Sequence, residues 1–169
     1  GYEPLDHKNV DTGFGFDRML LFLNGLSDGY KTDLFASVIA EIETLSGKRY
    51  DDGGAAQRAM RIIADHTRTS VLLIGDEQGI LPSNTGAGYI LRRIMRRAIR
   101  YCRQLEIPSS ALLAIAKIFI REIYNEACPL LKEKEGYIRE EIAKESERFE
   151  QTLNQGMKEF EKCVGGLER

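Results

Sequence analysis

Apolar residues recur every three or four positions through most of the chain, which is the spacing of amphipathic helices. The clearest case is a seam near the C-terminus whose members are 4, 7, 4, 4, 3 and 4 residues apart: Ile138, Ile142, Phe149, Leu153, Met157, Phe160 and Val164. The pattern predicts helices over residues 14–25, 32–45, 55–73, from Gly88 or Tyr89 through an arginine-rich segment, 109–127 and about 130–164. The predicted fold class is therefore mainly α, a multi-helix domain.

The beginning of the chain departs from this pattern. Residues 1–13, GYEPLDHKNVDTG, are polar and carry turn-forming residues at both ends. The piece from His7 to Thr12 is predicted to be a short strand. Together with the helix that starts near Phe14, it would make an N-terminal strand-turn-helix that belongs to another domain.

The composition is that of an ordinary globular protein, with 169 residues of which 43% are hydrophobic and 30% charged. No run of 18 apolar residues is present, so no membrane partner is expected. The three cysteines, Cys102, Cys128 and Cys163, lie far apart and form no C-x-x-C pair. This favours reduced thiols in a cytoplasmic protein over a disulfide framework or a zinc site.

Charge changes the picture, because one segment is strongly basic although the net charge of the whole chain is only −2. Residues 58–103 contain nine arginines, no lysine and three acids. At about 100° per residue, six arginines of the predicted helix share one face, opposite Leu91, Ile94, Met95, Ala98, Ile99 and Cys102. The six are Arg92, Arg93, Arg96, Arg97, Arg100 and Arg103.

Two interpretations of this arginine face stay open. The guanidinium groups could pair with acids of the C-terminal helix, because charged faces are usually solvated or ion-paired. They could instead bind a polyanion, since guanidinium groups suit phosphate and no acid shares their face. The loop before the helix favours the polyanion. Asn84 both donates and accepts hydrogen bonds, and Gly86 and Gly88 let the loop approach a base edge in the shallow minor groove of double-stranded RNA.

A second group of candidate residues lies in the segment DTGFGFDR, residues 11–18. Gly13 and Gly15 stand at a predicted strand-to-helix turn, where backbone can approach a nucleotide or a small substrate closely. The N–H groups of a helix N-terminus favour anions. Asp11 is placed to receive an ammonium group, and Arg18, one turn into the helix, to reach a phosphate. A glycine pair of this kind also occurs in many tight turns without a ligand.

The two segments together resemble one family. VDTGFGFDRM is similar to motif 3 of the class II aminoacyl-tRNA synthetases, in the form typical of the alanyl-tRNA synthetases. RIIADHTRTSVLLIGDEQGILPSNTGAGYILRRIMRRAIRY is similar to the tRNA-recognition segment of that family. Motifs 1 and 2 and the editing domain have no counterpart. The resemblance therefore implies an internal fragment with three parts. These are the C-terminal end of the aminoacylation domain (1–25), a helical tRNA-recognition domain (26–129) and a long helix leading towards the editing domain (130–169).

The resemblance also implies roles for single residues in the first segment. Asp11 matches the acid that binds the α-amino group of alanine, and Gly13 matches the glycine beside it. Arg18 matches the arginine that holds the γ-phosphate of ATP. Asp17 stands where the family usually has glutamate, a departure that leaves the arginine assignment intact.

In the second segment, Asn84 matches the asparagine that reads a G·U wobble pair in the tRNA acceptor stem. The arginines after it match a basic helix that lies along the backbone of the stem; they are Arg92, Arg93, Arg96, Arg97 and Arg100. The zinc ligands of the family belong to the editing domain. His66 has no second ligand near it in sequence and is interpreted as a structural or RNA-proximal residue.

The parent enzyme implied by this resemblance joins alanine to its tRNA with ATP, through an alanyl-adenylate and with Mg²⁺ on the phosphates. Its partners are alanine tRNA, ATP and alanine. The 169-residue chain alone is predicted to be inactive and to bind no cofactor tightly. A hypothesis of another class stays open beside this one, namely a helical protein-interaction module whose arginine face docks an acidic partner.

Overall fold

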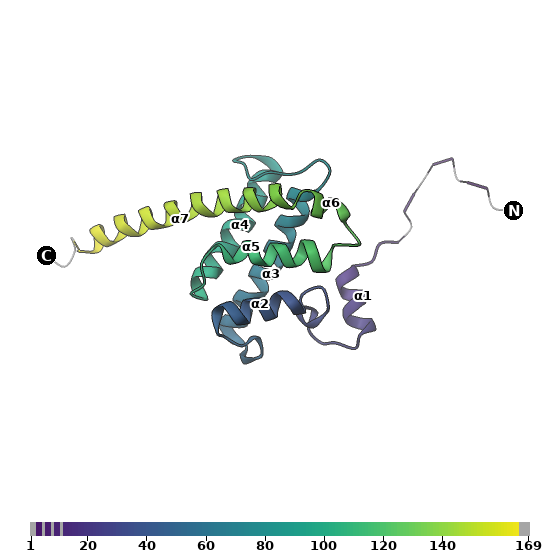
Figure 1. Ribbon diagram of the computed structural model, residues 1–169, viewed down its shortest axis with the longest axis horizontal. Helices are drawn as coiled ribbons and strands as arrows, with labels where there is room; N and C mark the ends of the chain where they lie inside the picture. Colours follow the sequence, from purple (N-terminus) through teal and green to yellow (C-terminus); the bar gives the residue numbers. More distant parts are fainter. Residues whose placement is uncertain (1–2, 5, 8, 11, 166–169) are drawn as a thin grey trace. The chain divides into compact units, whose positions relative to one another are not determined.

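The structure is a computed structural model that describes residues 3–4, 6–7, 9–10 and 12–165 (Figure 1). It divides into two compact units, Gly1–Ala36 and Ser37–Arg169. Helices dominate the second unit and make up part of the first, and none of the described residues belongs to a strand. The prediction of a mainly α fold is thus confirmed, whereas the division expected at residues 25 and 129 stays a prediction.

The first unit contains α1 (Phe16–Leu23) and the short 3₁₀ helix η1 (Gly29–Lys31). Gly15 precedes α1 in an extended conformation, and Gly25 follows its end with a φ of +62°, a value that suits glycine. The strand expected over His7–Thr12 is wrong for the residues described there, which form bends or irregular backbone. A strand must pair its N–H and C=O groups with a neighbouring strand, and the described residues supply none.

The second unit is a bundle of helices. After α2 (Ala36–Ser46), which starts at the junction of the units, come η2 (Tyr50–Asp52), α3 (Gly54–Gly75), α4 (Gly86–Gln104), α5 (Ala111–Ile118), the π-helical turn η3 (Phe119–Ile123), α6 (Pro129–Glu133) and α7 (Glu135–Gly165). The most extensive packing is between α3 and α4, and α5 and α7 cover that pair (Figure 1). The side chains that fill the core come from all four helices and include Met60, Ile63, Ile74, Leu91, Met95, Leu112, Ile115, Ile138 and Ile142.

The observed helices differ from the predicted ones in their limits, and three of these differences have a local cause in the structure. Helix α2 begins at Ala36 because residues 32–35 form a turn, in which the Thr32 carbonyl accepts from the N–H groups of Phe35 and Ala36. The predicted helix over 109–127 is α5 followed by a wider π-helical turn. The single helix predicted from about residue 130 is two helices, because a turn at Lys134 separates α6 from α7.

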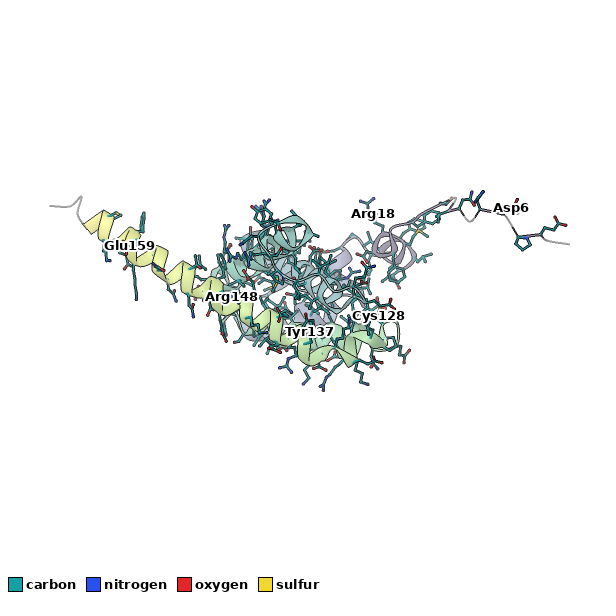
Figure 2. The ribbon with its side chains drawn as sticks, turned by 90° about the horizontal axis from the view of Figure 1, so that it is seen from above. Asp6, Arg18, Cys128, Tyr137, Arg148 and Glu159 are labelled. Atoms are coloured by element: carbon teal, nitrogen blue, oxygen red, sulfur yellow. The ribbon has the colours of Figure 1, made fainter. Side chains whose placement is uncertain are left out.

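Helix α7 uses only the first part of its predicted apolar seam for packing. Ile138 and Ile142 are buried, whereas residues 154–164 are all exposed. Figure 2 shows Glu159 on the end of α7 that extends away from the other helices of the second unit. Within the described part of the chain, no helix combines the length and the apolar character needed to cross a membrane.

Candidate functional site

Helix α4 separates an apolar face from a basic one, as its sequence predicts. Leu91, Met95, Ala98, Ile99 and Cys102 are buried, mostly against α3. The basic face carries the arginines from Arg92 to Arg100. Burial raises the pKa of the Cys102 thiol to about 12, so this cysteine is a neutral core group beneath the arginines.

Two arginines of the basic face are committed to one buried acid, Glu145 of α7. Arg96 donates from Nε to Glu145 Oε1 over 2.7 Å, and Arg92 Nε lies 3.6 Å from Oε2 of the same carboxylate. The side chain of Glu145 is only 2% exposed. Arg96 also lies over the ring of Phe149, with its guanidinium carbon 5.0 Å from the ring centroid. The acidic C-terminal helix therefore neutralises part of the arginine face.

The other three arginines of the row, Arg93, Arg97 and Arg100, are exposed. No acidic side chain of the described residues lies within ion-pairing distance of them. Arg93 and Arg97 lie instead over the rings of Tyr89 and Tyr101, with guanidinium-to-centroid distances of 5.8 and 5.9 Å. A contact with an aromatic ring does not neutralise the positive charge of these two arginines.

These arginines line a groove of about 510 Å³ on the second unit. Its walls combine four guanidinium groups with a histidine and apolar side chains: His66, Ile90, Arg93, Ile94, Arg96, Arg97, Arg100 and Phe149. Ile94, predicted on the apolar face, is half-buried and lines this groove. Positive charge beside apolar and aromatic surface suits a ligand that carries phosphates and rings.

His66 contacts its neighbour Asp65, with 2.8 Å between Nδ1 and Oδ2, and its side chain is 13% exposed. Among the residues that the structure describes, no three His, Cys, Asp or Glu side chains are grouped to hold a metal ion. His66 lines the groove together with the arginines, and its interpretation as a structural or RNA-proximal residue stays a prediction.

The loop that carries Asn84 is folded against the N-terminus of α4. Ser83 N–H donates to the Gly88 carbonyl over 3.1 Å, and Ser83 Oγ donates to the Thr85 carbonyl over 2.8 Å. Gly86 adopts a φ of +57°. A Cβ atom at Gly88 would lie 2.3 Å from the Leu81 carbonyl oxygen, so only glycine fits this crossing. The two glycines singled out in the sequence thus shape the loop.

Asn84 is exposed at the tip of this loop, and its side chain is oriented by α4. Arg92 donates from Nη1 to Asn84 Oδ1. Of the five arginines assigned to RNA by the resemblance, Arg92 therefore contacts both the loop and Glu145. The structure brings Asn84 and Arg92 together, and it leaves Arg93, Arg97 and Arg100 facing outward.

The first predicted group lies in the other unit. Gly13 and Arg18 are exposed around the start of α1, whereas Asp11 lies outside the described residues. Gly15, the residue before α1, has no side chain to cap the helix, so N–H groups of the first turn are left for another acceptor.

Sequence reasoning missed Glu145, although one signal pointed to it. The apolar seam of α7 steps by seven positions from Ile142 to Phe149, and Glu145 and Ser146 occupy the missing turn. Both are buried. A polar residue in a core stripe needs a partner, and Glu145 finds two in the arginines of α4.

Comparison with known proteins places the chain in a family. The family model described as tRNA synthetases class II (A) matches residues 1–169. The chain is 44% identical over 166 residues to an alanine–tRNA ligase of Borrelia hermsii, which covers 98% of this chain and 28% of that protein. It is also 39% identical over 163 residues to each of two further alanine–tRNA ligases, from Halalkalibacterium halodurans and Treponema pallidum. Each alignment covers 96% of this chain, together with 18% of the Halalkalibacterium halodurans protein and 27% of the Treponema pallidum protein.

The chain thus spans less than a third of the length of these relatives. The family model nevertheless matches it from its first residue to its last. The chain belongs to the family of tRNA synthetases class II (A).

Proposed function

We propose that this chain is the part of an alanine–tRNA ligase that holds the acceptor stem of alanine tRNA. The parent enzyme would join alanine to its tRNA with ATP through an alanyl-adenylate. The observation that carries the proposal is the row of Arg93, Arg97 and Arg100, which lines one groove without acidic partners among the described residues. This row lies directly behind the loop of Asn84.

The spacing of the row suits a chain of phosphates better than a single anion. With a rise of 1.5 Å per residue, Arg97 and Arg100 lie about 6 and 10 Å along the helix axis from Arg93. The sequence interpretation in which the arginines pair with the C-terminal helix holds for Arg92 and Arg96 only. The three arginines left over supply the positive charge that an RNA backbone requires.

Asn84 supplies the second part of the proposed interface. Its amide lies at an exposed loop tip ahead of the arginine row, where a base edge in the shallow minor groove of an RNA duplex is accessible. Phosphate contacts position a duplex, and base-edge contacts carry its sequence information. We propose that Asn84 reads the G·U pair of the stem and that the arginines hold its backbone.

The start of α1 supports a role in ATP binding. The guanidinium group of Arg18 and the N–H groups at the start of α1, which no side chain caps, are hydrogen-bond donors that suit a phosphate. We propose that Arg18 binds the ATP phosphates in the parent enzyme, where Mg²⁺ would offset their charge, and that Gly13 keeps the adjacent turn open. Asp11 remains the proposed partner of the alanine ammonium group.

A salt series with variants tests the arginine row. Binding of the chain to an RNA hairpin with the acceptor-stem sequence of alanine tRNA is measured from low to moderate salt. Arg93→Ala, Arg97→Ala and Arg100→Ala should each weaken binding and flatten the salt slope by roughly one, because each removes one phosphate contact. Arg58→Ala is the matched control, since Arg58 is exposed on α3 and does not line the groove.

Binding of an acidic peptide, measured in parallel, decides between the two classes of function. If the chain retains the acidic peptide as tightly as the hairpin, the arginine face is a protein-docking surface. If the hairpin binds with a salt slope that none of the three variants changes, the groove does not contact phosphate and the proposal fails.

A further inference from the structure

We propose that Glu145, on α7, is a positioning residue for Asn84, acting through Arg92. This inference rests on the proposed function, in which Asn84 reads a base pair of the acceptor stem. It assigns to a buried carboxylate, distant in sequence and not exposed to RNA, a role in the specificity of the interface.

The contacts form one continuous chain from α7 to the loop tip. Glu145 Oε1 accepts a hydrogen bond from Arg96 Nε over 2.7 Å, and this bond holds the carboxylate in place. Arg92 Nε lies 3.6 Å from Glu145 Oε2, and Arg92 Nη1 donates to Asn84 Oδ1. Arg92 therefore spans the space between the buried acid and the exposed amide, and its side chain is only 18% exposed.

This chain fixes which end of the Asn84 amide faces outward. A guanidinium group donates hydrogen bonds and accepts none, so the atom that Arg92 contacts must be the amide oxygen. The NH₂ group is then directed away from Arg92 and presents its donors to a ligand. Without Arg92 in this place, the amide could rotate and offer either end, which would remove the distinction between donor and acceptor on a base edge.

Burial explains why Glu145 controls this geometry. The carboxylate is buried, and a buried charge persists only when it is paired. Glu145 Oε2 and Arg92 Nε are both buried, and neither has a hydrogen-bond partner among the described atoms. Their attraction across 3.6 Å is thus an ion pair without a hydrogen bond. Arg92 thus lies between Glu145 on one side and Asn84 on the other, and it contacts both.

The test is the preference of the chain for a hairpin with a G·U pair over one with a G·C pair at the same place. Glu145→Gln removes the charge and keeps the size and an acceptor for Arg96. We expect this variant to lose the preference by about fivefold or more, the lower range of a single base contact. Its affinity for the G·C hairpin should be unchanged or higher, because the substitution removes an acid from the basic face.

This combination separates positioning from mere support of the fold, since a damaged fold would weaken binding to both hairpins. Glu141→Gln is the matched control, because Glu141 lies on the same helix and pairs with Lys144 over 2.9 Å. It should leave the preference intact. Arg92→Gln provides a second route if Glu145→Gln does not fold. The double variant should lose no more preference than either single one, because the two residues act in one chain.

Two further outcomes distinguish failure of the reading role of Asn84 from failure of the positioning role of Glu145. If the unmodified chain shows no preference, or if Asn84→Ala keeps it, Asn84 does not read the pair, and both the proposed function of Asn84 and this inference fail. If Asn84→Ala abolishes the preference while folded Glu145→Gln and Arg92→Gln retain it, the reading role stands and the positioning role of Glu145 is overturned.

Discussion

The amide of Asn84 has two ends: its oxygen accepts a hydrogen bond from Arg92, and its NH₂ group is the proposed contact to RNA. Asn84→Ala should therefore lose about 1–3 kcal/mol of discrimination between G·U and G·C stems. Asn84→Asp should lose it as well, although a carboxylate still accepts from Arg92. This discrimination is measured from the binding of both variants to G·U and G·C hairpins at one salt concentration.

The neighbouring Thr85→Ala is the control for these two variants, because Thr85 is exposed and its side chain does not cap α4. Retention of full discrimination by Asn84→Asp would mean that the NH₂ group makes no contact with the base pair. In that case the asparagine would serve only as an acceptor for Arg92.

Cys102 illustrates how burial changes the chemistry of a single side chain. Its pKa is raised to about 12 because the thiolate would be desolvated. Alkylation by iodoacetamide at about pH 8.5 should modify exposed Cys163 first and Cys102 only on unfolding, because the thiolate is the nucleophile. Because this pKa is raised above its ordinary value of 9.0, the stability that the neutral thiol contributes is fully present below about pH 9. That contribution is lost as the pH rises towards 12. Rapid labelling of Cys102 in the folded chain would contradict this.

At the scale of elements, the junction between the Asn84 loop and α4 depends on Gly88. An added Cβ would lie 2.3 Å from the Leu81 carbonyl and 2.4 Å from Ser83 Oγ. Gly88→Ala should therefore displace the loop and reduce the free energy of unfolding by about 1–3 kcal/mol. Urea denaturation measures the stability, and hairpin discrimination should fall as well because the loop carries Asn84.

Gly156→Ala is the matched control for this prediction. Gly156 lies within α7, and apart from the adjacent backbone of that helix no atom lies within 4 Å of an added Cβ, so alanine should stabilise the helix by up to about 1 kcal/mol. If Gly88→Ala were as stable as the parent chain, the loop would not be confined by the close approach seen in the structure.

At the scale of the whole molecule, the chain covers 28% of the length of its Borrelia hermsii relative. It folds into two compact units. We predict that the 169-residue polypeptide alone catalyses no alanine-dependent ATP–pyrophosphate exchange, because the motif 2 contacts that the resemblance implies for ATP are not among its residues. A full-length alanine–tRNA ligase is the positive control. Measurable turnover by this chain would show that its own residues complete an adenylation site.

Much of the second unit follows from sequence alone, because helical periodicity is a local property of the backbone. The apolar stripe of α4, its arginine face and the glycines that shape the Asn84 loop were all predictable. The proposed roles of Asn84 and Arg18 came from resemblance. The strand expected over His7–Thr12 was wrong for the residues described, because a strand depends on a neighbour that local pattern cannot supply.

Tertiary structure decided which arginines are free to bind a ligand. Consecutive residues of a helix differ by about 100° in direction. When α7 packs beside α4, Glu145 therefore takes Arg92 and Arg96 and leaves Arg93, Arg97 and Arg100 outside. All five arginines look alike in sequence, and the acid that separates them lies 49 residues beyond Arg96. The apolar packing that seats α7 on α4 is a long-range interaction, so the division between arginines paired with Glu145 and exposed arginines exists only in the folded chain.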